Sequence, residues 1–233
     1  MLLTSELPYA GHASVRDSSD SCGADLRPGS RFLYDAGRMD HPRGSLRNWR
    51  SGGRVSARGP VPKRSWEKQA GILVNAGFRA LAIDLRGFGL SKEGPKNARS
   101  DFGSPLDVLA AVRYLHANRT KTVSIIGASM GGDAAEGAVG EAKPGEIDRI
   151  VLLAHGAYGP PEKLKGRKLF IVSRNDVGPG DKPRPVRIRE QYEKAPAPKK
   201  LVILDGAAHA QFIFETDQAA RLMHEILTFL SER

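Results

Sequence analysis

Cysteine is nearly absent from this chain of 233 residues, which contains only Cys22. One cysteine excludes an internal disulfide framework and a zinc site built from four thiolates. No apolar run approaches the roughly 18–20 residues that are needed to cross a bilayer. The first ten residues, MLLTSELPYA, lack both a basic region and the roughly 7–15-residue apolar stretch of a signal peptide. We therefore expect a soluble, cytoplasmic protein.

The net charge of +10 raises the question of a nucleic-acid partner. Residues 1–64 carry 11 Lys and Arg against 6 Asp and Glu, which is half of the excess, and the rest is scattered along the remaining chain. A nucleic-acid-binding protein usually gathers its basic residues on one face or carries a recognisable module, and the sequence has neither. We interpret the charge as solvated surface charge and expect neither a nucleic-acid nor a membrane partner.

Composition divides the chain near Ser65. Residues 1–64 contain no Ile, ten Arg and many Gly, Ser, Pro and Asp, whereas all eleven Ile lie in 65–233. No apolar pattern in 1–64 alternates or recurs at helical spacing for long enough to form an element. Such a segment buries too little apolar surface to offset its ordering entropy. We expect a basic N-terminal segment of low order followed by a folded core.

Helix and strand signals alternate along residues 65–233. Ser65 is expected to cap a first helix over 66–75. Further helices are predicted at 105–118, 134–139 and 216–230, and strands at 78–83, 122–126, 149–153, 168–172 and 201–204. Most of these strands are runs of Val, Ile and Leu with little polar interleaving, which is typical of a parallel sheet covered on both faces. The predicted fold class is α/β, with a doubly wound, mostly parallel sheet.

The most informative stretch is Gly127-Ala128-Ser129-Met130-Gly131, a Gly-x-Ser-x-Gly pattern between a buried strand and a helix. This context is the one that a nucleophilic serine on a strand-to-helix turn requires. The turn strains the serine backbone and needs small neighbours. The helix N-terminus also offers positive dipole character to a developing oxyanion.

With this motif, residues 65–233 resemble the α/β-hydrolase superfamily, in particular its esterase and serine-aminopeptidase-like members. A second landmark is Asp84-Leu-Arg-Gly87-Phe-Gly89-Leu-Ser91 after a predicted strand. The resemblance implies that this loop shapes the rim of the active site and that its residues are structural. It also implies an α/β-hydrolase type of sheet.

A serine nucleophile needs a base and an orienting acid, in the chain order Ser, Asp or Glu, His. Asp176 and His209 each lie on a loop beyond a predicted strand, at the sheet edge where Ser129 emerges, and at the positions that the resemblance implies for acid and base. The predicted catalytic triad is Ser129, Asp176 and His209. The N–H of Met130 is predicted as one oxyanion-hole donor. No cofactor or metal is implied.

Other titratable residues compete for these roles. His155 also ends a strand, but it precedes the acid in the chain. His116 and His224 fall on predicted helices. Asp205 is an alternative acid, although it lies close in sequence to His209, and Asp181 is a weaker candidate in the same loop as Asp176.

The second oxyanion donor normally comes from a loop after the third strand of the sheet, just before the first helix of the core. Here that place reads Gly-Gly-Arg-Val-Ser-Ala-Arg-Gly-Pro-Val-Pro over residues 52–62, with no apolar strand and no His-Gly-Gly. Codons can be chosen for this stretch so that a one-base shift reads Val-Val-Val-Leu-Ala-His-Gly-Gly-Arg-Phe. We hypothesise that much of residues 1–64 is translated out of frame; the alternative is an unusual disordered tail. The first strands of the sheet are then expected to be missing or distorted.

The predicted function is a serine hydrolase that cleaves an ester, thioester or amide through an acyl-enzyme. Few residues separate the strand at 149–153 from that at 168–172, where many relatives insert a helical cap, so we expect no cap domain. An open site favours small esters or exposed acyl or peptidyl ends as substrates. The alternative is an inactive or truncated hydrolase-like protein that only binds. The sequence leaves the oligomeric state open.

Overall fold

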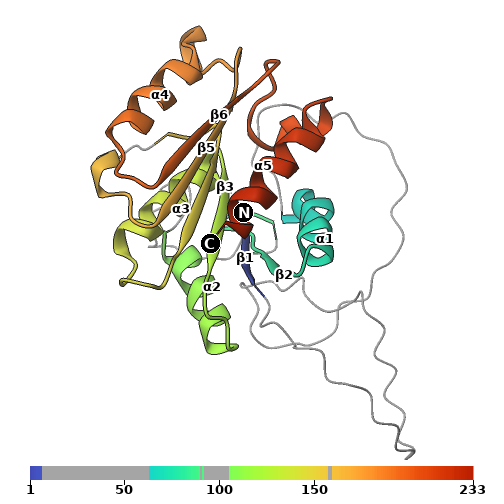
Figure 1. The fold of residues 1–233 in the computed structure, drawn as a ribbon, viewed down its shortest axis with the longest axis vertical. Coiled ribbons are helices and arrows are strands. Elements are labelled where there is room, and N and C mark those ends of the chain that lie inside the picture. The colour runs from blue at the N-terminus through green and yellow to red at the C-terminus, as the bar shows by residue number, and fades with distance from the viewer. Residues whose placement is uncertain (7–62, 90, 92–104, 157–158, 233) are drawn as a thin grey trace, which may run out of the picture.

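The computed structural model describes residues 1–6, 63–89, 91, 105–156 and 159–232. This part of the chain forms a six-stranded sheet in the order β2-β1-β3-β4-β5-β6 (Figure 1). The strands are β1 (Leu2–Glu6), β2 (Phe78–Ala82), β3 (Ser124–Ala128), β4 (Arg149–Leu153), β5 (Arg167–Ser173) and β6 (Lys199–Leu204). Strands β3 to β6 pair in parallel, and β1 is antiparallel to both of its neighbours.

Helices cover both faces of this sheet (Figure 1). Helices α1 (Glu67–Asn75) and α5 (Ala219–Ser231) share one apolar cluster with one face of the sheet. Helices α2 (Pro105–Ala117), α3 (Met130–Glu141) and α4 (Arg184–Lys194) share a second cluster with the other face. The predicted doubly wound, mostly parallel α/β sheet is confirmed.

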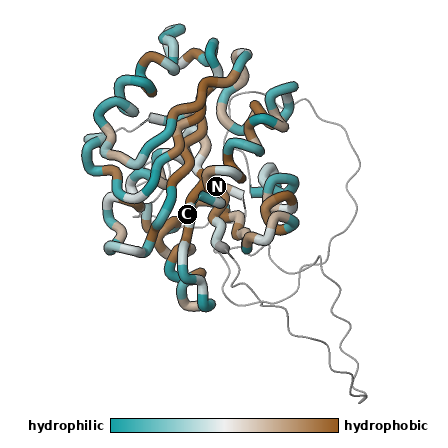
Figure 2. The backbone as a smooth tube through the Cα atoms, in the orientation of Figure 1, coloured by the Kyte–Doolittle hydropathy of each residue, from teal (hydrophilic) through white to brown (hydrophobic). Residues whose placement is uncertain are grey.

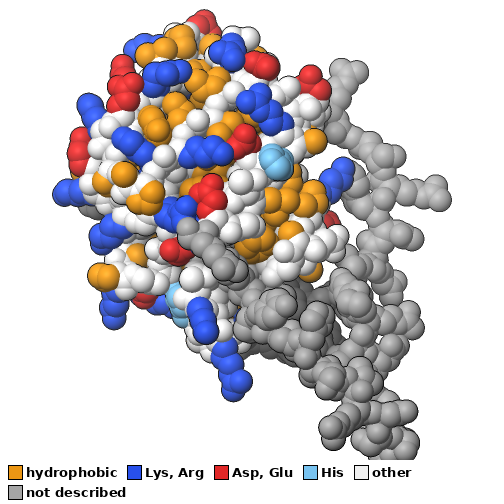
Figure 3. Space-filling model, viewed as in Figure 1, with side chains coloured by type: hydrophobic (Ala, Val, Ile, Leu, Met, Phe, Trp, Pro, Cys, Tyr) orange, Lys and Arg blue, Asp and Glu red, His pale blue; other side chains and the backbone are white. Residues whose placement is uncertain are grey.

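Buried apolar strands hold these layers together. Every residue of β3 and β4 is buried. Figure 2 shows hydrophobic strands at the centre, flanked by helices that carry many hydrophilic residues. On the face seen in Figure 3, basic and acidic side chains are interspersed over the described residues. Among those residues, no helix is long and apolar enough to span a membrane.

Strand β1 corrects the expectation that residues 1–64 contain no element. Leu2 and Leu3 are fully buried and point into opposite apolar clusters. Leu2 pairs with Ala82 on one side and with Ile126 on the other. Five residues are too few for a periodic signal, and backbone hydrogen bonds to two neighbouring strands stabilise the extended conformation instead. Residues 7–62, which include the place of the expected third strand, lie outside the described residues.

The start of the first core helix also differs from the prediction. A 3-10 turn, η1 (Lys63–Trp66), precedes α1, and Trp66 occupies the N-cap position without a side-chain hydrogen bond. Ser65 is therefore not the cap. Its Oγ accepts a hydrogen bond from the side-chain amide of Gln211 (2.6 Å), which ties this turn to the segment after β6.

Candidate active site

Ser129 lies on a sharp turn between β3 and α3. Its φ of +50° and ψ of −116° place it in a strained region of backbone conformation. A Cβ on Gly127 would lie 2.4 Å from the carbonyl oxygen of Gly131, so the turn can close only with glycine at position 127. The N–H of Ser129 donates to the carbonyl of Leu153 (2.9 Å), which joins the turn to β4. These contacts give the physical reason for the small residues around the serine.

Three side chains form a continuous hydrogen-bonded chain at this turn. The Oγ of Ser129 lies 2.9 Å from Nε2 of His209, and Nδ1 of His209 lies 2.8 Å from Oδ2 of Asp176. A carboxylate only accepts hydrogen bonds, so Nδ1 carries a proton and donates it to Asp176. In a neutral imidazole this leaves the lone pair of Nε2 facing the serine hydroxyl. The three residues predicted as one group from the sequence thus lie together.

The loops that carry the acid and the base are joined by further hydrogen bonds. Asp176 follows β5, and His209 precedes the 3-10 helix η4 (Ala210–Glu215) after β6. The hydroxyl of Ser173 donates to the carbonyl of Ala208 (2.6 Å), and the N–H of Asn175 donates to that of Gly206 (2.9 Å). The relative position of the two loops is therefore fixed by contacts outside the triad itself.

Asp176 has a second charged partner that sequence reasoning missed. Its side chain is 2% exposed, and its Oδ1 lies 3.2 Å from Nε of Arg184, the first residue of α4. The backbone N–H of Arg184 also donates to the carbonyl of Asp176 (2.9 Å). Each carboxylate oxygen of Asp176 therefore faces a nitrogen donor.

Met130 is the first residue of α3. The N–H groups of Gly132 and Asp133 donate to the carbonyl of Ser129 (2.8 and 3.3 Å), so the first turn of the helix is formed. The first N–H groups of a helix have no intrahelical acceptor and carry the positive end of its dipole. Residues 52–62, where the sequence leads us to seek a second oxyanion donor, lie outside the described residues.

The competing candidates have other partners. Asp205 is exposed and pairs with Arg174 (3.2 Å). Both ring nitrogens of His116 lie near backbone carbonyls, those of Thr120 (3.0 Å) and Glu146 (2.8 Å). The remaining alternatives, His224 on α5 and Asp181 in the 3-10 helix η3 (Pro179–Asp181), are exposed.

The Asp84 loop has a structural role in the fold. Oδ1 of Asp84 accepts a hydrogen bond from the N–H of Lys63 (2.7 Å), where η1 begins. A Cβ on Gly89 would lie 2.1 Å from Oδ2 of Asp84, and the φ of Gly89 is +54°. The loop therefore wraps the Asp84 carboxylate closely and anchors the start of the first core helix.

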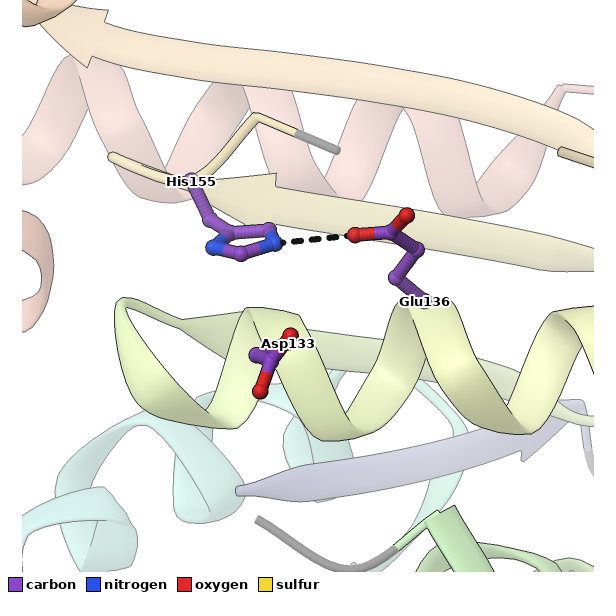
Figure 4. A group of neighbouring side chains, drawn as sticks. All are labelled: Asp133, Glu136 and His155. Atoms are coloured by element: carbon purple, nitrogen blue, oxygen red, sulfur yellow. Dashed lines mark hydrogen bonds and ion pairs between the residues drawn. The ribbon is translucent and has the colours of Figure 1, made fainter. Parts of the chain in front are cut away.

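One group of side chains could in principle hold a cation. Asp133, Glu136 and His155 each offer a ligand atom, and these atoms lie within 4.8 Å of one another. His155 reaches from the end of β4 toward Glu136 on α3 (Figure 4). The two carboxylate oxygens of Glu136 already accept hydrogen bonds, one from His155 Nε2 (3.2 Å) and one from the N–H of Gly159 (2.9 Å). This is the arrangement of a buried structural pair, and a metal would have to displace these bonds.

The His155–Glu136 pair packs against the serine turn. A Cβ on Gly132 would lie 2.5 Å from Cβ of His155. His155 is 5% exposed, so its ring fills the space that the glycine leaves open. The only sequence signal of this contact is the second glycine after Met130. A glycine alone does not predict which side chain packs against it.

Comparison with known proteins agrees with this architecture. A family model described as "Serine aminopeptidase, S33" matches residues 64–175, and the chain resembles α/β hydrolases over this segment. A Synechocystis sp. protein that carries the name of a non-heme chloroperoxidase is 34% identical over 99 residues, covering 41% of this chain and 33% of that protein. The chain thus spans about a third of the length of this curated relative.

Solved structures of α/β hydrolases resemble the fold over most of the chain. The Paleococcus ferrophilus monoacylglycerol lipase matches with a TM-score of 0.56 at 15% identity, covering 72% of this chain and 89% of that one. The esterase EaEST from Exiguobacterium antarcticum matches with a TM-score of 0.54 at 12% identity, covering 74% and 89%. At these identities the likeness shows the α/β-hydrolase fold alone.

Proposed function

We propose that the protein is a serine hydrolase that cleaves an ester, thioester or amide through a covalent acyl-enzyme. The observation that carries this proposal is the hydrogen-bonded chain of Ser129, His209 and Asp176, with distances of 2.9 and 2.8 Å. Both distances are within the reach that proton transfer requires. The match to the serine aminopeptidase model over 64–175 supports the same reaction class.

In this mechanism Nε2 of His209 accepts the proton of the Ser129 hydroxyl as Oγ attacks the substrate carbonyl. Asp176 keeps the imidazole in the tautomer with the proton on Nδ1 and stabilises the imidazolium that forms. The N–H of Met130 donates to the oxyanion of the tetrahedral intermediate. The imidazolium then protonates the leaving group, and a water attacks the acyl-enzyme with His209 again as base.

The short β4–β5 connection bears on the substrate class. Strand β4 ends at Leu153 and β5 begins at Arg167, and the 3-10 helix η2 (Pro161–Lys163) lies between them. This connection leaves little room for a cap domain over the site. We therefore favour small esters, or exposed acyl or peptidyl ends, over long chains that need an enclosed tunnel.

Labelling with a fluorophosphonate tests the proposal, because this probe reacts covalently with an activated serine. We expect labelling of the wild type and its loss in Ser129→Ala. Ser231→Ala, on the last residue of α5, is the matched control and should label like the wild type. Asp176→Asn should slow turnover by about 10⁴-fold. p-Nitrophenyl esters and aminoacyl p-nitroanilides then separate esterase from aminopeptidase activity.

The second candidate is a hydrolase-like protein without activity. It is favoured by the antiparallel direction of β1 relative to its two neighbouring strands. It is also favoured by the absence, among the described residues, of an assigned second oxyanion donor. A folded wild type that does not label would support this alternative and contradict the hydrolase.

A further inference from the structure

We propose that Arg184 is a positioning residue that holds Asp176, and through it His209, in the reactive arrangement. The proposal rests on the function proposed above and adds to the triad a residue that the sequence did not single out. The two carboxylate oxygens of Asp176 have different partners. Oδ2 faces His209 at 2.8 Å, while Oδ1 faces the guanidinium of Arg184 at 3.2 Å.

Arg184 is itself held in place by the loop that it closes. Its Nε–H donates a hydrogen bond to the carbonyl of Val177 (3.2 Å), while the same nitrogen forms an ion pair with Asp176. Val177 pairs with Pro183 in a β-bridge, and the N–H of Gly178 donates to the carbonyl of Lys182 (2.7 Å). The loop from Asp176 to Arg184 therefore folds back on itself, and the guanidinium at its end lies beside the carboxylate at its start.

Two consequences follow for the base. The cation lies beside the oxygen of Asp176 that does not face His209, so the carboxylate cannot rotate without lengthening this ion pair. It also offsets part of the negative charge of a carboxylate that is 2% exposed. That charge favours a proton on the imidazole, so Arg184 opposes protonation of the base before substrate arrives. The other charged side chains of the loop, Asp181 and Lys182, are exposed.

The test compares the pH dependence of fluorophosphonate labelling in four proteins. Arg184→Met removes the cation, and Arg184→Lys keeps a cation but removes the planar guanidinium. Arg189→Met is the matched control, because Arg189 lies on the same helix, is exposed, and its loss changes the net charge equally. The measured quantity is the second-order labelling rate constant from acidic to neutral pH, with folding followed by circular dichroism.

In Arg184→Met we expect the plateau rate to fall about tenfold, since small displacements of a catalytic group cost up to about 10²-fold. We also expect its acidic limb to move to higher pH. Arg184→Lys should return the limb toward that of the wild type while its plateau stays reduced, and Arg189→Met should overlay the wild type. If the curve of Arg184→Met overlays that of the wild type, the inference is overturned. If Arg184→Met does not fold, Arg184→Lys decides, because an unchanged plateau in that variant overturns it.

A readout that needs no catalysis separates this inference from the proposed function. The ring of His209 can be titrated by NMR in the wild type, Arg184→Met and Arg189→Met. A midpoint that rises only in Arg184→Met supports the inference even if the wild type fails to label, in which case the hydrolase proposal alone is wrong. Equal midpoints in all three proteins, with labelling of the wild type intact, refute the role of Arg184 and leave the hydrolase standing.

Discussion

Replacement of Thr4 by valine should stabilise this protein. Thr4 lies in β1, opposite Ala80 on one side and Ser124 on the other, and it is fully buried. Its Oγ1 has no hydrogen-bond partner among the described residues. A buried hydroxyl without a partner costs about 1–3 kcal/mol, and valine places a methyl group of similar shape in the same space. We expect Thr4→Val to raise the free energy of unfolding by about 1–2 kcal/mol.

Urea unfolding at neutral pH measures this change, with thermal melting as a second method. For a chain of this size, 1 kcal/mol corresponds to about 2–4 °C in Tm. Thr4→Ser is the matched variant, because it keeps the hydroxyl and removes the methyl group. It should destabilise the protein by about 1 kcal/mol. If the free energy of unfolding rises in Thr4→Val and falls in Thr4→Ser, the side chain lies in a tightly packed apolar environment.

Two results would refute the reasoning. If both variants unfold like the wild type, Thr4 is not buried and β1 does not occupy the centre of the sheet. If Thr4→Val is destabilising, the hydroxyl has a partner and its burial carries no penalty. Ser5→Ala repeats the test one residue along, since Ser5 is also buried and its Oγ also lacks a partner among the described residues.

Three further predictions concern other parts of the fold. Gly71→Ala should stabilise α1 by up to about 1 kcal/mol in urea unfolding, because a Cβ there meets nothing within 4 Å and alanine favours helix. Gly132→Ala should destabilise by about 1–3 kcal/mol through its clash with His155, and equal unfolding of variant and wild type would contradict that contact. Burial lowers the pKa of the Lys168 ammonium below 10.5, and the nearby Lys199 lowers it further. At pH values between the lowered pKa and 10.5, the unfolded state therefore binds more protons than the folded state. Relative to Lys168→Met, the wild type should gain stability as the pH rises through this interval. Urea unfolding at successive pH values measures the difference.

The grouping of Ser129, Asp176 and His209 was predictable because chain order and strand ends constrain it strongly. In a parallel sheet the carboxyl ends of the strands meet at one edge, so Ser129, Asp176 and His209 had to emerge on the same side. The glycines around Ser129 marked the turn. The competing residue Asp205 was weakened by its closeness in sequence to His209, and in the structure it pairs with Arg174 instead.

Contacts between side chains from separate elements could not be predicted in the same way. Arg184 follows a Pro- and Gly-rich loop, and no spacing rule says that such a loop returns to Asp176. Helix α4, which begins at Arg184, was missed as well, because its face toward the core contributes a single buried residue, Ile188. Likewise Glu136 and His155 lie on different elements, and only the folded chain shows that they pair.

The limits of α3 illustrate how packing overrides local preference. The small-residue run over 134–139 predicts this helix, although Gly131 and Gly132 before it disfavour helical conformation. In the structure α3 begins at Met130, directly after the serine turn, and runs to Glu141. The glycines allow the close approach of Gly127 and His155, and that approach outweighs their poor helix propensity.

The direction of β1 connects the fold to the unassigned second oxyanion donor. Leu2 pairs with Ala82 and Glu6 with Phe78, the last and first residues of β2, so the amino end of β1 lies at the edge where Ser129 emerges and its carboxyl end lies at the opposite edge. A strand in this direction cannot lead into an oxyanion loop at the edge where Ser129 emerges. An apolar parallel strand that ends in His-Gly-Gly could lead into such a loop. It would compete with β1 for the same place between β2 and β3.

The out-of-frame hypothesis for residues 1–64 therefore makes two linked predictions. A one-base shift in the nucleotide sequence upstream of the Ser65 codon should restore an apolar strand that ends in His-Gly. In the protein made from that corrected frame, the restored strand should displace β1, and Thr4→Val should no longer raise the free energy of unfolding. If no such shift exists, the hypothesis is wrong, and β1 is the native strand at the centre of this sheet.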